Sequence, residues 1–444
     1  MGKIKNALKK TPLREFVWKM RGTPFFQWLD CRHRDYLYGK KLPGIFQQNA
    51  EKEPVDEKKV IFVEQRYAKL TDNFKLLYQD LEKAGCHIRV HYLRESFVDA
   101  AVYEKNCCIL AADMASAKVV FLNEGSDAVS CVPKREGQKY VQLWHACGAF
   151  KKFGMSTGNL EFGLSTEQQL RHPHYGNLDL VPVSSEAVRW AYEEAMHLGD
   201  TPDVVKPLGC SRTDEFFDPD FRKAAFEHLY QCCPWTRGKK IILYAPTFRG
   251  RVAIAQTPDY TVHFDLAKLE KKLGGEYAVL VNRHPLIKKE YLPEWPEQIS
   301  SEFAKDVTGL LSIKELLCVS EICITDYSSV IFEYSLFEKP MVFYAYDLDT
   351  YFDWRGFYYS YEELTPGPGC RTVDEIIDYI QHIDKRFDRQ AVKDFRRKFM
   401  GACDGHATER IEQEIFGKSF RMEADETEGN LQNTASGLHE RSEE

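Results

Sequence analysis

The chain has 444 residues and a mass of 51.5 kDa, which is enough for two or three domains with sizeable cores. Hydrophobic residues make up 43% and charged residues 29%, which excludes a mainly disordered chain, a collagen and a coiled coil. No stretch of about 18 apolar residues runs without a charge, which argues against a transmembrane helix. The net charge of −7 argues against nucleic acid as a partner.

The first part of the chain is basic and aromatic. Residues 1–41 carry 11 Lys/Arg against 3 Asp/Glu, whereas the remaining residues carry 49 against 64. The aromatic side chains of this stretch are Phe16, Trp18, Phe25, Phe26, Trp28, Tyr36 and Tyr38. Aromatic rings favour the membrane interface and basic residues favour anionic headgroups. We therefore expect residues 1–56 to form a segment that contacts an anionic membrane surface, with a solvated helical arm as the alternative.

The next block, residues 57–208, alternates between strand-like and helix-like segments. Short β-branched or apolar runs predict strands at 59–64, 88–93, 118–122, 140–144, 180–183 and 204–207. Helical periodicity covers 72–84, which Gly85 closes, and 186–198. This alternation indicates a parallel sheet that is covered by helices on both faces.

The same pattern restarts in residues 209–418. Strands are predicted at 240–245, 277–282, 321–325 and 340–344, and helices at 312–319 and 328–337 and throughout 373–416. Two such blocks indicate an α/β protein of two doubly wound domains that face a cleft, with their junction near Gly209. Residues 419–444 are acidic and poor in apolar side chains, which predicts a disordered tail.

Polar residues that directly follow strands are the first candidates for a site, because ligands bind at the carboxyl ends of parallel strands. His145 follows the strand at 140–144 and can serve as a general base, since imidazole titrates near neutral pH. Lys151 and Lys152 come shortly after it and are assigned to the acceptor side. A histidine that simply packs at the start of a loop is the alternative.

Two strand ends of the second block carry groups that suit phosphate. Thr247 and Arg249 follow the strand at 240–245, and a guanidinium offers a two-pronged donor to a phosphate. Arg283 and His284 follow the strand at 277–282 and place up to two positive charges there. A solvated arginine, and a strand that merely ends at a proline, are the alternatives.

A third strand end of this block leads straight into a helix. Asp326, Ser328 and Ser329 lie at that helix start, where hydroxyls and backbone N–H groups can bind an anion. Simple helix capping explains the same residues. Glu333 lies one turn later, where a carboxylate can accept hydrogen bonds from ribose hydroxyls. Together the three strand ends predict a nucleoside-diphosphate donor in the second domain, although the sequence has neither a P-loop nor a GxGxxG motif.

The thirteen cysteines are scattered, without a CxxC pair and without a histidine-rich partner. In a long chain that lacks a secretory signal, this pattern predicts buried thiols in a reducing cytoplasm. A disulfide framework or a metal site is not expected.

Several longer motifs stand in a fixed order along the chain: VQLWHACGAFKKFG (141–154), GCSRTDEFF (209–217), LYAPTFRG (243–250), RHP (283–285), ITDYSSVIFEY (324–334), KPMVFYAYDLDTY (339–351) and RGFYYSYEELTPGP (355–368). On these residues the chain resembles the CDP-glycerol glycerophosphotransferase family of teichoic-acid assembly, over roughly residues 57–415.

The resemblance implies a GT-B-like architecture, with an acceptor-side Rossmann-like domain at 57–208 and a CDP-alditol-binding one at 209–418. It implies transfer of glycerol phosphate from CDP-glycerol to a hydroxyl of a lipid-linked (polyprenyl-diphosphate) acceptor, with release of CMP and without a cofactor. His145 and His284 match the family histidines regarded as essential, and Asp326 to Ser329 and Arg355 match segments linked to the donor phosphates. The expected location is peripheral, on the cytoplasmic face of the cell membrane.

One loop departs from the family. After Trp-His the commonest family pattern is Gly-Thr-Pro-Leu-Lys, whereas this chain has ACGAFK at 146–151. The histidine and the lysine keep their places, but the loop between them differs, which leaves the acceptor open. The family also includes CDP-ribitol users. Ribitol phosphate transfer and a nucleotide-sugar glycosyltransferase of the GT-B class are therefore the alternatives.

Overall fold

A computed structural model describes residues 24–158, 160, 165–201, 203–247, 264–284, 295, 299–349 and 356–417. The chain divides into two compact units. The first comprises Met1–Leu70, Cys86–Tyr140 and Arg171–Asn177, and the second comprises Thr71–Gly85, Val141–Leu170 and Leu178–Glu444. Among the described helices, none is both long and apolar enough to cross a membrane.

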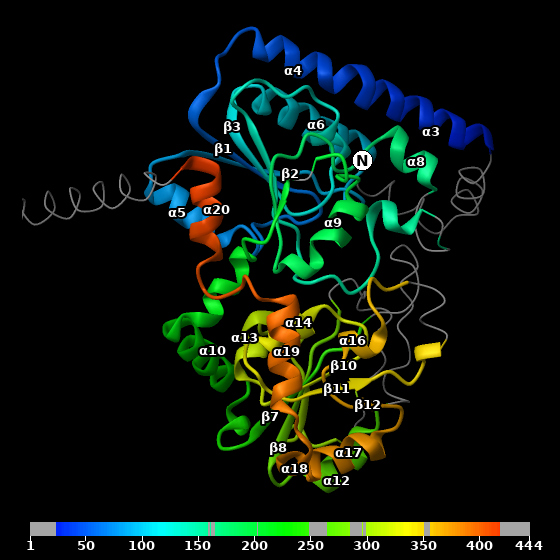
Figure 1. The fold of residues 1–444 in the computed structure, drawn as a ribbon, viewed down its shortest axis with the longest axis vertical. Coiled ribbons are helices and arrows are strands. Elements are labelled where there is room, and N and C mark those ends of the chain that lie inside the picture. The colour runs from blue at the N-terminus through cyan, green and yellow to red at the C-terminus, as the bar shows by residue number, and fades with distance from the viewer. Residues whose placement is uncertain are drawn as a thin grey trace, which may run out of the picture. The chain divides into compact units, whose positions relative to one another are not determined.

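The described part of the first unit begins with three consecutive helical segments. They are α3 (Pro24–Tyr36), the π-helical turn η1 (Leu37–Lys41) and α4 (Leu42–Ala50) (Figure 1). Buried apolar side chains on η1 and α4, among them Leu42 and Phe46, face inward, and α4 packs against α6 (Ala100–Met114). The second half of this basic stretch is therefore an integral part of the first unit.

A four-stranded sheet forms the centre of the first unit. Its strands are β1 (Asp56–Glu64), β2 (His87–Tyr92), β3 (Ala117–Leu122) and β4 (Lys139–Gln142), in the order β2-β1-β3-β4. The central strand β1 runs parallel to both neighbours, with Ile61 opposite Arg89 on one side and Val120 on the other. Its buried run of β-branched residues explains the central place of β1, because a strand between two covered faces needs apolar side chains on both.

The second unit is built on a six-stranded sheet. Its strands are β7 (Lys240–Tyr244), β8 (Tyr277–Val281), β9 (Ala304–Asp306), β10 (Ile322–Thr325), β11 (Met341–Tyr344) and β12 (Gly369–Cys370). Their order is β12-β11-β10-β7-β8-β9, and every neighbouring pair is parallel. The chain runs from β7 outward through β8 to β9 and then crosses to β10 on the other side of β7. The reversal leaves a crevice at the carboxyl ends of β7 and β10, which is where such sheets bind ligands.

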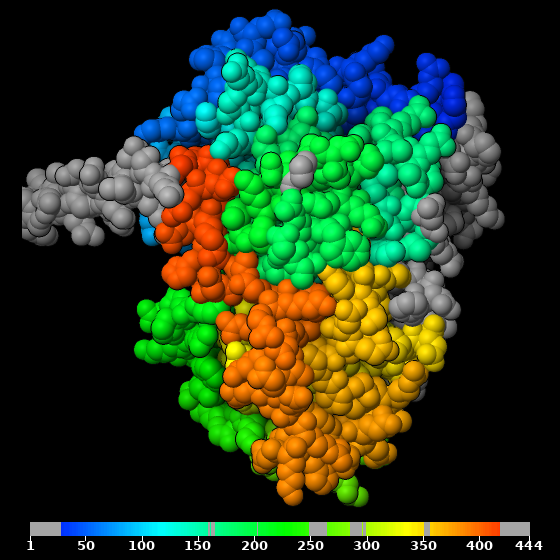
Figure 2. All heavy atoms as spheres, viewed as in Figure 1, coloured from blue at the N-terminus to red at the C-terminus, as the bar shows by residue number. Residues whose placement is uncertain are grey.

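Helices surround this sheet and form the outer surface of the second unit in the view of Figures 1 and 2. They include α10 (Pro219–Cys232), α12 (Leu266–Leu273), α13 (Ile313–Val319), α14 (Val330–Ser335), α16 (Tyr361–Leu364), α17 (Val373–Gln381), α18 (Ile383–Arg386) and α19 (Arg389–Phe399). The last helix, α20 (Ala407–Phe416), lies apart from this sheet, beside α5 (Lys75–Lys83) (Figure 1). The Ser312 and Thr372 side chains begin α13 and α17 with capping boxes, which satisfy the first backbone N–H groups of each helix. The apolar faces of α12 and α17 bury into one core with the strands.

A small parallel sheet of β5 (Val181–Pro182) and β6 (Val205–Lys206), together with α9 (Arg189–Ala195), also belongs to the second unit. The Ser184 hydroxyl donates to the Phe399 carbonyl at 2.6 Å, and the Ala402 N–H donates to the Ser184 carbonyl at 2.9 Å. These bonds tie residues 178–208 to the C-terminal helices. Gly209, at the predicted junction, therefore lies inside the second compact unit.

The prediction of an α/β fold built on parallel strands is confirmed, but the six strands predicted for residues 57–208 divide into the four-stranded sheet and the separate sheet of β5 and β6. All ten predicted strands are present, with ends that differ by a few residues, and β9 and β12 are additional. The helix predicted at 328–337 is the shorter α14. The domain limits at 57–208 and 209–418 do not coincide with the compact units and stay a prediction. The predicted tail at 419–444 lies outside the described residues.

Candidate active site

A cavity of about 240 Å³ lies in the second unit, at the carboxyl ends of β7 and β10. Seven of the predicted site residues line it: His145, Lys151, Lys152, Thr247, His284, Ser328 and Ser329. The two histidines are far apart in the sequence and come together in this cavity. Its volume lies below the range typical of a pocket that encloses a whole drug-sized ligand, so it suits one part of a nucleotide donor.

The charge of the cavity lining favours an anion. Lys151, Lys152 and two imidazoles supply positive or ionisable groups, and Thr247 adds a hydroxyl beside the two serines. None of the described residues that line the cavity carries a carboxylate. Ammonium, imidazole and hydroxyl donors without a competing carboxylate are the groups that bind phosphate.

The His145 loop begins with a backbone conformation that is rare for a bulky residue. Trp144, directly before His145, has φ of +60°, in the left-handed region, which costs about 1–3 kcal/mol. The Trp144 indole lies against the His145 imidazole with ring centroids 4.3 Å apart, and it stacks on Phe153 at 4.5 Å. The sharp turn directs the chain away from β4, and the exposed His145 side chain reaches the cavity.

Several hydrogen bonds fix the rest of this loop. The Gly148 N–H donates to the Ser184 hydroxyl at 3.1 Å, and the Tyr192 hydroxyl donates to the Gly148 carbonyl at 2.9 Å. The Lys152 N–H donates to the Gly356 carbonyl at 3.1 Å. The loop between His145 and Lys151, which departs from the family pattern, is thus held to two neighbouring segments of the same unit.

A cluster of thiols lies behind the loop. Cys147 and its neighbours Cys210 and Cys403 are buried, and hydrogen bonding with these neighbours, together with burial, raises the pKa of Cys147. All thirteen cysteines of the chain are free thiols. Among the described residues, no group of three or more His, Cys, Asp or Glu side chains is placed to hold a metal ion.

Asp326 links the two loops that form the crevice. Its buried Oδ1 accepts hydrogen bonds from the Thr247 N–H at 2.9 Å, the Thr247 hydroxyl at 2.6 Å and the Tyr327 N–H at 2.6 Å. Asp326 is not among the residues that line the cavity. The carboxylate therefore joins the end of β7 to the end of β10 and so positions the residues on either side.

The two serines line the cavity but do not cap α14 in the usual way. Ser329 is the N-cap residue and its side chain makes no capping hydrogen bond, whereas the Ser328 hydroxyl accepts from the Val330 N–H at 3.4 Å. Simple capping therefore does not explain Ser329. Because α14 has only six residues, Val330–Ser335, its dipole is smaller than that of the longer helix predicted there.

Two further predicted residues are buried and paired with charges of the protein. The Arg283 Nε lies 3.1 Å from the Asp306 Oδ2, and the Glu333 Oε1 lies 3.0 Å from the Arg212 Nε. Burial raises the pKa of Glu333, and the positive charge of Arg212 opposes that rise. Neither Arg283 nor Glu333 lines the cavity. Their assignment to the donor stays a prediction, and Arg249 and Arg355 lie outside the described residues.

Sequence reasoning missed some residues of the site. Phe153, Tyr192 and Tyr327 line the cavity, and Arg212 donates to the His145 carbonyl at 3.1 Å. Arg212 lies in the motif at 209–217, which supported the family resemblance, but the sequence offered no reason to give this arginine a chemical role.

With this geometry established, comparison with known proteins gives the family. A sequence model described as CDP-glycerol:poly(glycerophosphate) glycerophosphotransferase matches residues 45–417. The chain belongs to this glycerophosphotransferase family. Membership places it among the teichoic acid glycerol- and ribitol-phosphate primases and polymerases.

Curated relatives within the glycerophosphotransferase family include both alditol types. The chain is 34% identical over 363 residues to a teichoic acid ribitol-phosphate primase of Bacillus spizizenii, covering 81% of this chain and 90% of the primase. It is also 34% identical to a teichoic acid poly(ribitol-phosphate) polymerase of the same organism, and the match covers 82% of this chain and 56% of the polymerase. The chain thus spans about half the length of that polymerase. A glycerol-phosphate primase of Bacillus spizizenii is 28% identical, with 78% and 90% covered.

A solved structure supports the fold of this family member. The wall teichoic acid polymerase TagF matches with a TM-score of 0.69 at 20% identity, covering 95% of this chain and 100% of the solved chain. The expectation of a GT-B-like α/β architecture is therefore confirmed.

Proposed function

We propose that this chain transfers an alditol phosphate, glycerol phosphate in the first instance, from its CDP-ester to a hydroxyl of a lipid-linked acceptor in teichoic acid synthesis. One observation carries the proposal. His145 and His284 line a single cavity with two lysines and with the hydroxyls of Ser328 and Ser329. A general base and several donors to phosphate around one space are what a transfer of this kind needs.

The chemical step assigns a role to each histidine. The acceptor hydroxyl oxygen attacks the β-phosphorus, a new P–O bond forms, and the bond between this phosphorus and the bridging oxygen of the diphosphate breaks. His145 takes the proton of the hydroxyl. CMP leaves with the bridging oxygen, and His284, Ser328 and Ser329 stabilise the negative charge that develops there. Lys151 and Lys152 lie on the acceptor side.

The remaining donor residues act from around the cavity. Thr247 lines the cavity, and Asp326 orients Thr247 through the bonds described above. We assign Arg283, together with Arg249 and Arg355, to the neutralisation of the donor diphosphate, and Glu333 to the ribose side of the donor. No cofactor takes part in this scheme.

The alditol is the point on which the family divides. The family description names CDP-glycerol. Ribitol phosphate is the second candidate, because two ribitol-phosphate relatives from Bacillus spizizenii are 34% identical to this chain. Two ribitol-phosphate polymerases of Staphylococcus aureus are 30% identical, which lies within the 28% to 31% of the glycerol-phosphate primases and transferase. Sequence identity therefore does not separate the two alditols, and both donors are tested in parallel.

The acceptor would be met at an anionic membrane surface. On α3, Trp28 is 51% and Tyr36 is 56% exposed, and the Arg32 guanidinium lies 5.0 Å from the centre of the Trp28 ring. Exposed aromatic rings with a basic neighbour suit the headgroup region of a bilayer. We therefore place the chain peripherally on the cytoplasmic face of the cell membrane.

The membrane contact is tested by substitution and not by deletion, because η1 and α4 carry buried side chains that belong to the first unit. The full chain with Trp28→Ser and Arg32→Glu should sediment less with vesicles that contain anionic lipid, and wild-type binding should weaken as salt rises. Arg397→Glu, at an exposed position on α19, is the matched control. Equal sedimentation of the double variant and the wild type would remove this contact from the proposal.

The transfer itself is tested with the purified full chain. CDP-glycerol, CDP-ribitol and a UDP-sugar are offered separately with a short lipid-linked acceptor, and free nucleotides and products are measured. The proposal predicts CMP and an alditol phosphate product from at least one CDP-alditol, and loss of both in His145→Gln and His284→Gln. His382→Gln, at an exposed position, is the control. Release of a nucleoside diphosphate from the sugar donor alone would establish the glycosyltransferase alternative.

A further inference from the structure

The Arg212 side chain lies where three segments of the second unit meet. Its Nη1 donates to the His145 carbonyl at 3.1 Å and to the Asn73 Oδ1 at 3.1 Å. Its Nε lies 3.0 Å from the Glu333 Oε1, as an ion pair without hydrogen-bond geometry. The partners belong to the turn before α5 (Lys75–Lys83), to the loop after β4 and to α14. One guanidinium thus joins the His145 loop to the helix that follows the two cavity serines.

Burial makes this ion pair a strong constraint. The Arg212 side chain is 14% and the Glu333 side chain 5% exposed. A charged group that is shielded from water cannot exchange its partner for solvent, so each of the two charges holds the other in place. Lys314 and Asp72, which lie 3.7 Å from each other, also act on Glu333, and Lys314 is itself paired with the buried Glu215. The position of α14 is therefore coupled to the position of the His145 carbonyl.

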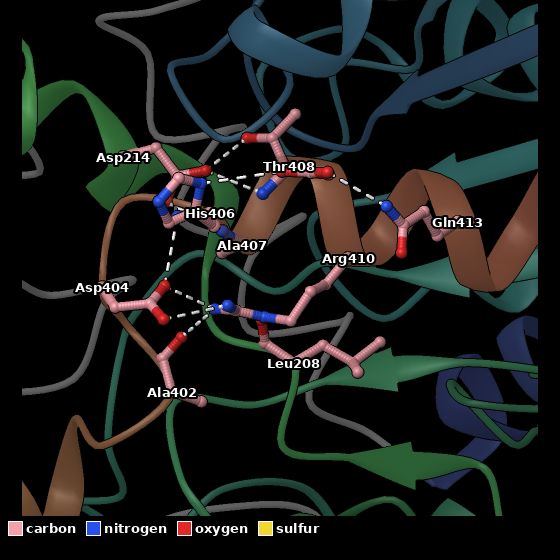
Figure 3. Close-up of polar contacts among 10 residues, drawn as sticks. Leu208, Asp214, Ala402, Asp404, His406, Ala407, Thr408, Arg410 and Gln413 are labelled. Atoms are coloured by element: carbon pink, nitrogen blue, oxygen red, sulfur yellow. Dashed lines mark hydrogen bonds and ion pairs between the residues drawn. The ribbon is translucent and has the colours of Figure 1, made fainter. Parts of the chain in front are cut away.

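The backbone around Arg212 is itself anchored by α20 (Figure 3). Asp214 accepts hydrogen bonds from the Thr408 N–H and the Thr408 hydroxyl, both at 2.7 Å. On the other side of Arg212, the Leu208 carbonyl accepts from the Arg410 Nε at 2.9 Å. Because the chain is fixed both before and after Arg212, the guanidinium is presented to its partners from a rigid support.

We propose that Arg212 is a positioning residue for the reaction, and that it sets the place of His145 relative to the donor-side serines. The inference rests on the proposed function. Trp144 turns the chain sharply just before His145, and the Arg212 bond to the His145 carbonyl holds the direction in which the chain leaves that turn. Arg212 does not line the cavity that holds the two histidines, so its effect on His145 is exerted through the loop.

The kinetic test separates positioning from substrate binding. Arg212→Met should lower kcat on the order of 10²-fold, because small displacements of a reacting group cost about that much, while KM for the CDP-alditol and the pH dependence of the rate stay as in the wild type. Arg212→Lys should recover part of kcat, since an ammonium can reach some of the partners but not all of them. Arg397→Met, at an exposed position, is the control. A rise in KM with unchanged kcat, or an unchanged kcat, would overturn the proposal.

A second measurement does not depend on the reaction. Hydrogen–deuterium exchange of peptides that span residues 141–151, followed by mass spectrometry on the free full chain, should become at least about tenfold faster in Arg212→Met. Exchange in α12 should stay as in the wild type. An unchanged exchange rate in 141–151 would refute the coupling. If neither CDP-alditol released CMP from the wild type, the proposed function would fail, and the exchange result would still decide whether Arg212 holds the loop.

Arg212→Met leaves a buried carboxylate without its partner and can impair folding. The double variant Arg212→Met with Glu333→Gln removes both charges, so it keeps the test valid. It should fold and show the faster exchange in residues 141–151, a readout that does not depend on the donor-side role assigned to Glu333. Recovery of the wild-type kcat in the folded double variant would overturn the positioning role.

Discussion

Gly148→Ala tests whether the His145 loop needs its close contact with α14. Gly148 has φ of +64°, and a Cβ built at this position would come closer than 3.0 Å to three atoms of the Phe332 ring. The ring has no room to retreat, because it stacks on Phe395 with centroids 5.4 Å apart and meets the edge of Phe399 at 5.6 Å. All three rings are buried.

The magnitude follows from two separate costs. An alanine in the left-handed region costs about 1–2 kcal/mol, and overpacking of a core position adds about 1–3 kcal/mol. The sum of roughly 2–5 kcal/mol corresponds to a fall in Tm on the order of 5–15 °C for the transition of the second unit. Because His145 lies on the same loop, CMP release by the folded variant should also fall.

Differential scanning calorimetry measures the stability effect. Gly275→Ala is the matched control, since a Cβ at Gly275 meets no atom within 4 Å and its φ is not positive. Adding Phe332→Leu to Gly148→Ala should recover the steric part of the loss but not the backbone part. If Gly148→Ala melted within about 2 °C of both the wild type and the Gly275→Ala control, the loop would not be packed as described.

Three other predictions concern the cavity and the first unit. His145→Ala and His284→Ala should each lower the transfer rate on the order of 10²–10⁴-fold with an unchanged Tm, as stopped assays of CMP release will show; near wild-type turnover would end the assignment of that residue. Ser328→Ala combined with Ser329→Ala should weaken CDP-alditol binding by roughly tenfold or more in calorimetric titration, because hydrogen bonds to a charged group contribute about 1.5–3 kcal/mol each; unchanged affinity would place the diphosphate elsewhere. Burial raises the pKa of Glu124 to about 7, above its ordinary value of 4.5, so the folded state binds this proton more tightly than the unfolded state. That contribution to stability is fully present below pH 4.5 and is lost as the pH rises through 7. As the pH rises from 4.5 to 7, the free energy of unfolding of Glu124→Gln, measured in urea, should therefore increase by up to about 3 kcal/mol relative to that of the wild type. A difference between the two proteins that does not change with pH would contradict the raised pKa.

The sequence was sufficient to predict most of the strands, although not their order or the separate sheet of β5 and β6. Short apolar runs that are rich in β-branched residues, such as KVIFVE at 59–64 and KIILYA at 240–245, favour a buried strand over other local structures. The two strands that were missed are short edge strands. β9 (Ala304–Asp306) lacks β-branched residues and β12 (Gly369–Cys370) begins with glycine, so only the neighbouring strands define them.

The cavity was predicted in part, because strand ends are visible in the sequence. Thr247, His284 and Ser328 were found by that rule. The direction of a charged side chain was not predictable, since it depends on partners that are distant in the chain. Asp326 bonds to Thr247, 79 residues away, and Glu333 faces Arg212, and neither pairing has a local sequence signal.

The placement of both histidines in one compact unit has a consequence for building chimeras. The natural cut suggested by the sequence, at Gly209, would separate His145 from Arg212 and from the cavity serines. A graft that exchanges only Met1–Leu70, Cys86–Tyr140 and Arg171–Asn177 with a relative would leave the two imidazoles, the lysines and the serines among their own neighbours. Membrane preference can therefore be sought by transplanting the first unit, while the spacing of the reactive groups is inherited intact from the recipient.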